Sequence, residues 1–312
     1  MKEGQRGACF VRRNVGGTLV LTSYGRASGL CVDPMEKKPL YHFLPGTDIL
    51  SFGTMGCHLA CRFCQNWHLS AATDERTMST AASPEQIAAT ALRHGCTSVA
   101  FTYNDPIPSL EFVVDVAAAC RERGLRTVAV TNGYITNEAR VEFFDAMDAA
   151  NVDLKAFTEE FYRRNCAAKL QPVLETLQYI ASRRRTWLEV TTLIIPGEND
   201  SEEELHALSE WVAGSLGRDV PLHFSAFRPA YRMTNHPPTP ASTLRRARTI
   251  AMQAGLRYVY TGNVYDPEGS ATYCPACRTP VIQREGFAVR VVALTENGEC
   301  ALCGAAVAGV WS

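Results

Sequence analysis

Short apolar runs alternate with amphipathic segments along most of the chain, and this alternation predicts a parallel α/β fold. We expect strands at residues 49–52, 97–103, 125–131, 152–157, 187–195, 222–227 and 258–261. We expect helices between them at residues 83–95, 110–123, 138–149, 172–183, 201–216 and 242–254. Strands that are separated by helices of this length pair in parallel through right-handed crossovers.

Six βα units are fewer than the eight that close a full barrel, so the pattern favours an open, partial (β/α)6 TIM-like barrel. A doubly wound sheet has the same alternation and stays an alternative. We expect residues 1–45 to form an N-terminal extension, residues 46–265 the barrel, and residues 266–312 a small C-terminal module.

Composition narrows the class of protein. The 312 residues are 46% hydrophobic and 20% charged, with a net charge of −1, which gives no global electrostatic argument for nucleic acid or an acidic membrane as partner. The polar start leads into no apolar signal segment, and no stretch approaches a membrane span. Twelve cysteines in such a chain predict reduced thiols and a cytoplasmic location.

Three cysteines, Cys57, Cys61 and Cys64, lie within eight residues in the spacing Cys-x3-Cys-x2-Cys. Soft thiolate ligands select iron–sulfur clusters, zinc or cuprous copper. Because a four-iron cluster normally takes four cysteines, three in one loop indicate a cluster with one open iron that can bind a substrate or cofactor. The alternatives are three buried structural thiols, or a zinc site completed by His58 or His68.

Polar segments follow five of the predicted strands, and a sixth such segment lies within the strand at 152–157. They are the cysteine loop and residues 103–106, 131–134, 153–155, 196–200 and 227–229. Because parallel α/β folds gather ligands at the carboxyl ends of their strands, we expect these segments to ring one mouth. Asp153 and Lys155 would share one side of their strand, where they meet either a zwitterionic ligand or each other in a private salt bridge.

The cysteine loop, with Phe63 just before the third cysteine, resembles the signature of the radical S-adenosylmethionine (SAM) enzymes. The following residues, Gln65-Asn66-Trp67, resemble relatives of the pyruvate formate-lyase activating enzymes. Residues 33–46, 52–57 and 223–225 are similar to the radical SAM component of the AmmeMemoRadiSam system. The resemblance implies a [4Fe-4S] cluster on Cys57, Cys61 and Cys64 whose fourth iron binds SAM. Reductive cleavage of SAM would then give a 5′-deoxyadenosyl radical that abstracts hydrogen from a substrate.

The same resemblance implies which side chains bind the SAM cofactor. They are Phe63, Gln65, Tyr103, Asn104, Asp105, Thr131, Asn132, Asp153, Lys155, Thr192 and Arg228. Two of these positions depart from the family pattern, because Asp105 stands where relatives carry glutamate and Arg228 where activating enzymes often carry histidine. His223, Ser225 and Arg228 are also expected at the mouth that meets the substrate.

The implied activity is that of an oxidoreductase like the activating enzymes, which would act on a glycine of a partner protein and take electrons from flavodoxin or ferredoxin. Radical modification of a small metabolite or of an RNA base is an alternative. A further alternative is a non-catalytic metalloprotein that binds a partner through its C-terminal module.

Four cysteines near the end of the chain predict a second metal site. Cys274-x2-Cys277 and Cys300-x2-Cys303 have the spacing of a zinc-ribbon or rubredoxin-like module. Zinc is favoured, because four thiolates complete its coordination sphere. In addition, a module of about 45 residues needs a structural metal or another cross-link to fold. A single iron or an auxiliary iron–sulfur cluster stays an alternative. Zinc would make the module a scaffold, whereas iron would make it part of the electron path.

Overall fold

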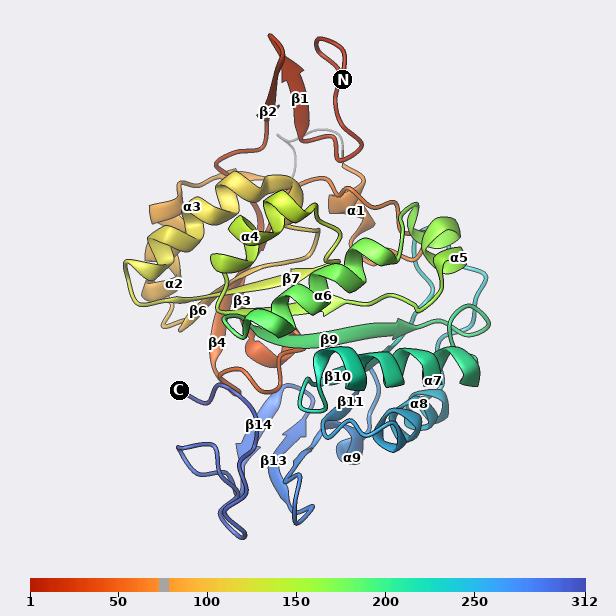
Figure 1. Cartoon of the computed structure of the whole chain (residues 1–312). Coiled ribbons are helices and arrows are strands. Elements are labelled where there is room, and N and C mark those ends of the chain that lie inside the picture. The colour runs from red at the N-terminus through yellow and green to blue at the C-terminus, as the bar shows by residue number, and fades with distance from the viewer. Residues whose placement is uncertain (73–78) are drawn as a thin grey trace.

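The computed structural model describes residues 1–72 and 79–312, and a curved nine-stranded sheet forms its centre (Figure 1). The strand order is β11-β10-β9-β8-β7-β6-β4-β3-β5. The first seven in this order are parallel to their neighbours. In chain order they are β4 (Asp48–Gly53), β6 (Ser98–Phe101), β7 (Arg126–Thr131), β8 (Ala149–Asp153), β9 (Trp187–Ile194), β10 (Leu222–Ala226) and β11 (Val259–Gly262).

One long helix lies between each successive pair of parallel strands, and two of these connections also contain a short helix. The long helices are α2 (Pro84–Arg93), α3 (Leu110–Arg121), α4 (Asn137–Asp145), α6 (Gln171–Arg183), α7 (Glu202–Trp211) and α8 (Ala241–Gln253). The strand order never reverses, so right-handed crossovers place all six helices on one face of the sheet. A doubly wound sheet needs a reversal, and the partial barrel is therefore the fold.

Local sequence signals, such as helix caps and hydrophobic periodicity, predicted the positions of most of these elements. Ser83 caps α2. Its hydroxyl accepts from the backbone amide of Gln86 at 3.3 Å, and its own backbone amide donates to the Gln86 side chain at 2.9 Å, so the two residues form a capping box. The fourth strand was misplaced. It spans 149–153 rather than 152–157, because its alanine-rich start reads as the end of the preceding helix.

The sequence did not predict the antiparallel strands at the N-terminus. β3 (Arg26–Pro34) pairs with β4 and with β5 (Thr80–Ala81) at one edge of the barrel sheet. Before it, β1 (Arg12–Val15) and β2 (Thr18–Leu21) form a hairpin. This hairpin and α1 (Trp67–Ser70) lie at one end of the molecule, opposite the C-terminal strands (Figure 1).

The segment after β3 packs against the amino-terminal halves of the barrel strands. Met35, Leu40, Phe43 and Leu44 form one buried cluster with side chains of β4, β6, β7 and β8. Deeper inside, the Asn151 amide donates to the Pro39 carbonyl at 2.7 Å. Residues 35–46 therefore close the amino end of the open barrel.

The C-terminal segment folds into a small antiparallel sheet of β12 (Thr272–Tyr273), β13 (Pro280–Glu285) and β14 (Ala288–Val291), preceded by α9 (Pro267–Ser270). Its buried Arg284 donates to the Tyr41 carbonyl at 2.7 Å, and the guanidinium lies 4.1 Å from the Tyr41 ring centroid. Val310 exchanges backbone hydrogen bonds with His42 and Leu44. This sheet therefore sits at the amino ends of the barrel strands.

Among the helices described, none combines the length and the apolar character that crossing a bilayer requires.

Candidate active site and metal centre

A cleft of about 570 Å³ opens at the carboxyl ends of the parallel strands. Twelve of the residues expected at the cluster or the SAM cofactor line it. They are Cys57, Cys61, Phe63, Cys64, Gln65, Tyr103, Asn104, Asp105, Thr131, Asn132, Asp153 and Lys155. The structure thus brings together side chains from the ends of β4, β6, β7 and β8, as expected for one mouth.

The cysteine loop begins at Gly56, where only glycine fits. Gly56 has a φ of +78°, in the left-handed region that side chains disfavour. A Cβ atom there would lie 1.9 Å from the carbonyl oxygen of Cys9. The N-terminal segment therefore lies directly against the start of the loop.

The segment after β6 holds both ends of the cysteine loop. The Asn104 side chain accepts from the Thr54 amide at 2.9 Å and donates to the Gly56 carbonyl at 2.7 Å. At the other end, the Asn66 amide donates to the Tyr103 carbonyl at 2.8 Å. Asn104 thus positions the loop through its own hydrogen bonds.

The middle of the loop rests on a turn near residue 165. The amide of Ala60 donates to the Cys166 carbonyl at 3.0 Å, and the amide of Arg62 donates to the Asn165 carbonyl at 2.8 Å. The turn belongs to a segment of π-helix, Tyr162–Cys166, which follows the short helix α5 (Glu159–Phe161). Single π-turns of this kind often mark functional sites.

The three loop thiols lie in surroundings that disfavour a free thiolate. Burial raises the pKa of Cys57 and Cys64, and a hydrogen bond with Cys166 together with burial raises the pKa of Cys61. Deprotonation here needs a compensating cation, which a bound metal centre provides.

Asp105 joins two of the strand ends. Its carboxylate accepts from the Asn132 amide at 2.7 Å, from the Thr131 hydroxyl at 3.0 Å and from the Ile107 amide at 3.0 Å. The Asn132 side chain in turn lies 3.1 Å from His58 in the cysteine loop. The Asp105 carboxylate is therefore engaged in positioning the segment after β7.

Asp153 and Lys155 form the ion pair that the sequence left as one of two possibilities. The Lys155 ammonium lies 3.0 Å from the Asp153 carboxylate and 5.8 Å from the Phe63 ring centroid. Burial alone would lower the pKa of Lys155, but the charges of Asp153 and of the neighbouring thiols Cys61 and Cys166 raise it well above its ordinary value. A fixed positive charge therefore stands beside the cysteine loop.

Two expected cofactor ligands do not line the cleft. The Thr192 hydroxyl is buried and donates to the Leu154 carbonyl at 2.8 Å, whereas Arg228 is exposed outside the cleft. Thr191 lines the cleft instead, and its buried hydroxyl has no hydrogen-bond partner within the described residues. Alternation along β9 explains the exchange, because neighbouring side chains face opposite sides of a strand.

Sequence reasoning missed Asn263, which also lines the cleft. It follows β11 in a left-handed conformation with φ +60°. The rule that located the other polar segments, namely polar residues directly after a predicted strand, would have found it.

The floor of the cleft comes from the N-terminal extension, which sequence reasoning also missed. Lys37 and Lys38 line the cleft, and each ammonium lies 2.7 Å from one oxygen of Asp33. The Tyr103 hydroxyl donates to the same carboxylate at 3.2 Å. Burial alone would raise the pKa of Asp33, but the two lysines hold it well below its ordinary value. No periodic pattern marks these residues as part of a site.

His223, expected at the mouth, lies below the floor. Its Nε2 is 2.6 Å from the buried carboxylate of Glu189, which also accepts from the amides of Tyr41 and His42. This hydrogen-bonded group belongs to the packed interior, beneath the residues that line the cleft.

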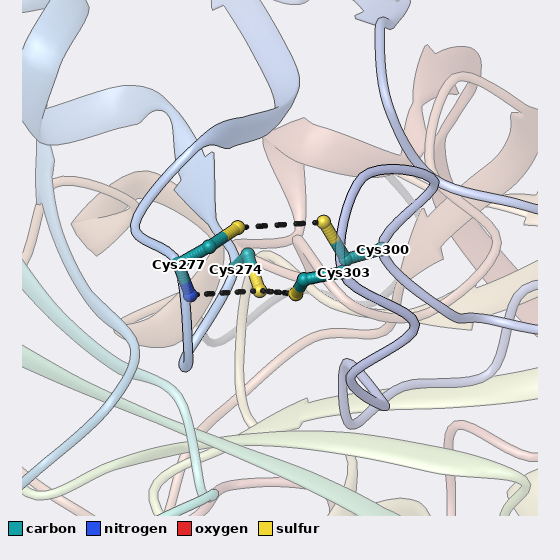
Figure 2. Close-up of side chains that lie close together, drawn as sticks. All are labelled: Cys274, Cys277, Cys300 and Cys303. Carbon is teal, nitrogen blue, oxygen red and sulfur yellow. Dashed lines mark hydrogen bonds between the residues drawn. The ribbon is translucent and has the colours of Figure 1, made fainter.

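The four C-terminal cysteines converge on one point (Figure 2). The sulfurs of Cys274 and Cys303 are 3.5 Å apart, those of Cys277 and Cys300 are 3.6 Å apart, and all four lie within 4.8 Å of one another. Four thiolates around one zinc ion have sulfurs roughly 3.8 Å apart, given zinc–sulfur bonds of about 2.3 Å. Hydrogen bonds with Thr279 lower the pKa of Cys277 to about 6, which favours the thiolate.

A single ion draws its thiolate ligands together. Within residues 1–72 and 79–312, the C-terminal four cysteines form such a group, and their spacing fits one ion.

Comparison with known proteins agrees with this geometry. The family model for the Radical SAM superfamily matches residues 52–208, from the end of β4 into α7. The chain belongs to the radical SAM superfamily.

Relatives extend over nearly the whole chain. An uncharacterized protein of Methanocaldococcus jannaschii (MJ0808) is 41% identical over 305 residues, covering 97% of this chain and 90% of its own length. The pyruvate formate-lyase 1-activating enzyme of Escherichia coli is 22% identical over 233 residues, covering 69% of this chain and 93% of its own length.

Solved structures share the fold. SuiB of Streptococcus suis bound to SAM superposes with a TM-score of 0.57 at 15% identity, covering 74% of this chain and 53% of that one. A radical SAM methyltransferase of Sphaerobacter thermophilus has a TM-score of 0.54 at 15% identity, covering 73% of this chain and 69% of that one. Membership of this superfamily implies a [4Fe-4S] cluster and SAM, and the lining of the cleft combines three soft ligands with polar side chains.

Proposed function

We propose that this protein is a radical SAM enzyme in which Cys57, Cys61 and Cys64 hold a [4Fe-4S] cluster beside the cleft. The observation that carries the proposal is the cysteine loop itself, with three thiols lining a cleft that the polar ends of the strands surround. When bound, the cluster and SAM together supply a 5′-deoxyadenosyl radical that abstracts hydrogen from a substrate.

The protein's own residues fix the geometry of this reaction. Asn104 and Asn66 hold the two ends of the cysteine loop, and Asp105 fixes the segment that carries Asn132. The Lys155 ammonium compensates negative charge beside the loop, and the buried Thr191 hydroxyl is free to bind a ligand.

We assign the SAM contacts to the lining residues that combine polar atoms with access to the cleft. Phe63, Gln65, Tyr103 and Asn132 line the cleft, and they occupy positions that the resemblance assigns to SAM binding. Thr192 and Arg228 stay predictions, and Thr191 is the better candidate on β9 because its hydroxyl has no partner within the described part of the chain.

The substrate class that we favour is that of the activating enzymes, namely a carbon-bound hydrogen in a glycine of a partner protein. Two activating enzymes among the relatives support this choice. These are the Escherichia coli enzyme and the 4-hydroxyphenylacetate decarboxylase activating enzyme of Clostridium scatologenes, which is 27% identical over 117 residues. An electron donor of flavodoxin or ferredoxin type, and the reducing cytoplasm that keeps both thiol sites competent, complete the proposal.

At the other end of the barrel, we propose that the C-terminal four cysteines bind zinc and that residues 266–312 form a structural module. The close spacing of the four sulfurs supports a single ion. The module contacts the amino ends of the strands, whereas the cleft lies at their carboxyl ends. That separation argues for a scaffold rather than an electron relay.

SAM cleavage tests the proposed activity directly. Protein reconstituted with iron and sulfide under anaerobic conditions should release 5′-deoxyadenosine from SAM when dithionite is added. Cys61→Ala should lose this activity by at least a hundredfold, because it removes a cluster ligand. Cys31→Ala, at an exposed cysteine outside the cleft, is the matched control and should keep it. Equal and negligible cleavage by all three proteins would sink the proposal.

A further inference from the structure

A second recess lies at the amino ends of the barrel strands, at the opposite end of the barrel from the cleft. It has a volume of about 470 Å³ and is lined by residues at the end of α6, in the loop 216–220 and in the C-terminal segment 308–310. Residues at the starts of β7, β8 and β9 also line it. We call it the amino-end recess. Its volume is in the range that small-molecule sites have.

Part of the wall of the amino-end recess is apolar. Ile180 of α6, Leu216 and Val310 line it, and Trp187 adds an aromatic ring that is only partly buried. Contact with such side chains removes apolar surface of a ligand from water and so favours its binding. The recess therefore offers a place for the apolar part of a small molecule.

Positive charge exceeds negative charge among the described residues that line the recess. The charged lining residues are Arg126, Asp148, Arg184, Arg185, Arg218 and Asp219. Both aspartates already have a cation of their own. Arg126 lies 3.2 Å from Asp148, and Arg257, which is outside the lining, lies 2.9 Å from Asp219. The aspartates therefore do not neutralise the remaining arginines.

Two of the remaining arginines have no acidic partner. Arg185 lies 3.4 Å from Asp145, outside the recess, whereas Arg184 and Arg218 form no ion pair with any residue that the structure describes. Both side chains are exposed, so a ligand can reach them. Guanidinium groups bind carboxylate, phosphate and similar oxyanions through a planar fork of N–H donors.

The backbone at Arg184 adds a second argument. Arg184 directly follows α6 with a φ of +54°, in the left-handed conformation where helices usually end with glycine. A side chain at this position costs conformational energy that glycine would avoid. The chain thus keeps an arginine beside the recess at a cost in stability, which is typical of residues that serve a function.

We propose that the amino-end recess binds a small organic anion. Its oxyanion group lies between Arg184 and Arg218, and its apolar part packs against Trp187 and the aliphatic wall. Two unpaired arginines in a recess of this volume suit one anionic group rather than the repeated phosphates of a nucleic acid. Because residues 308–310 line the same recess, the bound anion joins the barrel to the C-terminal segment. The site is independent of the proposed activity, since the cleft lies at the carboxyl ends of the strands.

Two matched probes test whether the site selects an anion. Anilinonaphthalene sulfonate has a sulfonate on an aromatic body, and phenylnaphthylamine is its neutral analogue. In calorimetry with the reconstituted full-length protein, the sulfonate should bind at one site. The neutral analogue should bind at least tenfold more weakly, because it offers no charge to the arginines. Equal affinity for the two compounds would overturn the proposal.

Removal of the two arginines tests their role. Arg184→Gly/Arg218→Ala should raise the dissociation constant of the sulfonate at least tenfold, because both charged donors are lost. Glycine suits the left-handed position, so the variant should keep its fold, which urea unfolding checks. Arg93→Ala/Arg121→Ala, at exposed arginines in the last turns of α2 and α3, is the matched control and should bind like wild type. Unchanged affinity in the first variant, or equal weakening in the control, would contradict the site.

Hydrogen exchange locates the bound probe. Anilinonaphthalene sulfonate should slow exchange in residues 180–188, 216–220 and 308–310 of the wild-type protein, because these segments line the recess. Exchange in the cleft segments 57–66 and 103–106 should not change. Protection of the cleft segments without protection of the recess would overturn the proposal, because the probe would then occupy the cleft.

Discussion

At the scale of single residues, hydrogen bonds from polar side chains determine the shape of the cleft. Asn104 and Asp105 both line the cleft, yet their polar atoms are mostly taken up by backbone groups of neighbouring segments. Residues that the sequence marks as ligands therefore also act as positioning residues, and the cysteine loop depends on them for its shape.

Gly56 shows how strict that shape is. Gly56→Ala should lower the free energy of unfolding by more than about 2 kcal/mol, because it combines the cost of a left-handed alanine with the clash against Cys9. It should also reduce the iron bound per chain, since the loop must move. Urea unfolding and iron analysis check both effects. Gly197→Ala is the control, because its φ of +75° is similar but nothing lies within 4 Å of the new atom. Similar losses of stability in the two variants would show that backbone strain causes the loss and that the clash with Cys9 does not.

At the scale of elements, the sequence predicted what local signals specify. The barrel helices and strands follow from periodicity and caps, and six helices appear where expected. The shifted start of β8 and the antiparallel β3 show the limit, because alanine-rich strands and edge pairings depend on tertiary burial. For the same reason the sequence located the cleft residues that follow strands but not Lys37 and Lys38, which reach the cleft only through the fold of the extension.

The extension should contribute to stability through Lys38. Lys38→Met removes one buried partner of Asp33 and should lower the free energy of unfolding by about 1–3 kcal/mol. Lys37→Met is the control, because the Lys37 side chain is 46% exposed and its ion pair should contribute less than about 1 kcal/mol. Urea unfolding measures both. A larger loss in the Lys37 variant would contradict the buried pair as the stronger contact.

At the scale of the whole molecule, the two predicted metal sites lie at opposite ends of one barrel, and the packed interior between them separates their roles. The buried groups around Glu189 and Arg284 attach the C-terminal sheet to the barrel. Damage to one site should therefore leave the other largely intact.

Loss of the C-terminal metal should unfold only its own module. Cys300→Ser, at a buried member of the four, should abolish zinc binding and increase hydrogen exchange across residues 272–310. Exchange in the barrel strands and iron at the cysteine loop should stay near wild-type levels. Cys96→Ser, at a buried cysteine outside both sites, is the control. Stoichiometric iron in place of zinc at the C-terminal site would overturn the assignment of zinc.

Acid should weaken the junction between barrel and module through His42. Burial lowers the pKa of His42 to about 4, so the folded protein keeps it neutral where the unfolded chain, with a pKa near 6.5, binds a proton. Stability should therefore fall as pH drops from 6.5 to 4, with a contribution of about 3 kcal/mol from this residue. His42→Gln, which can keep both hydrogen bonds without titrating, should show a smaller fall over that range. Identical pH profiles of unfolding would assign the acid sensitivity to other groups.

The hydrogen bonds between residues 42–44 and Val310 have a consequence for synthesis. These partners lie more than 260 positions apart in the chain, so a nascent protein cannot join them until residue 310 has left the ribosome. Until then, the segment around Val310 cannot pack over the apolar side chains at the amino end of the barrel. A shortened translation product that lacks this last stretch would expose an apolar, aggregation-prone surface. Chaperones and proteases would recognise that surface.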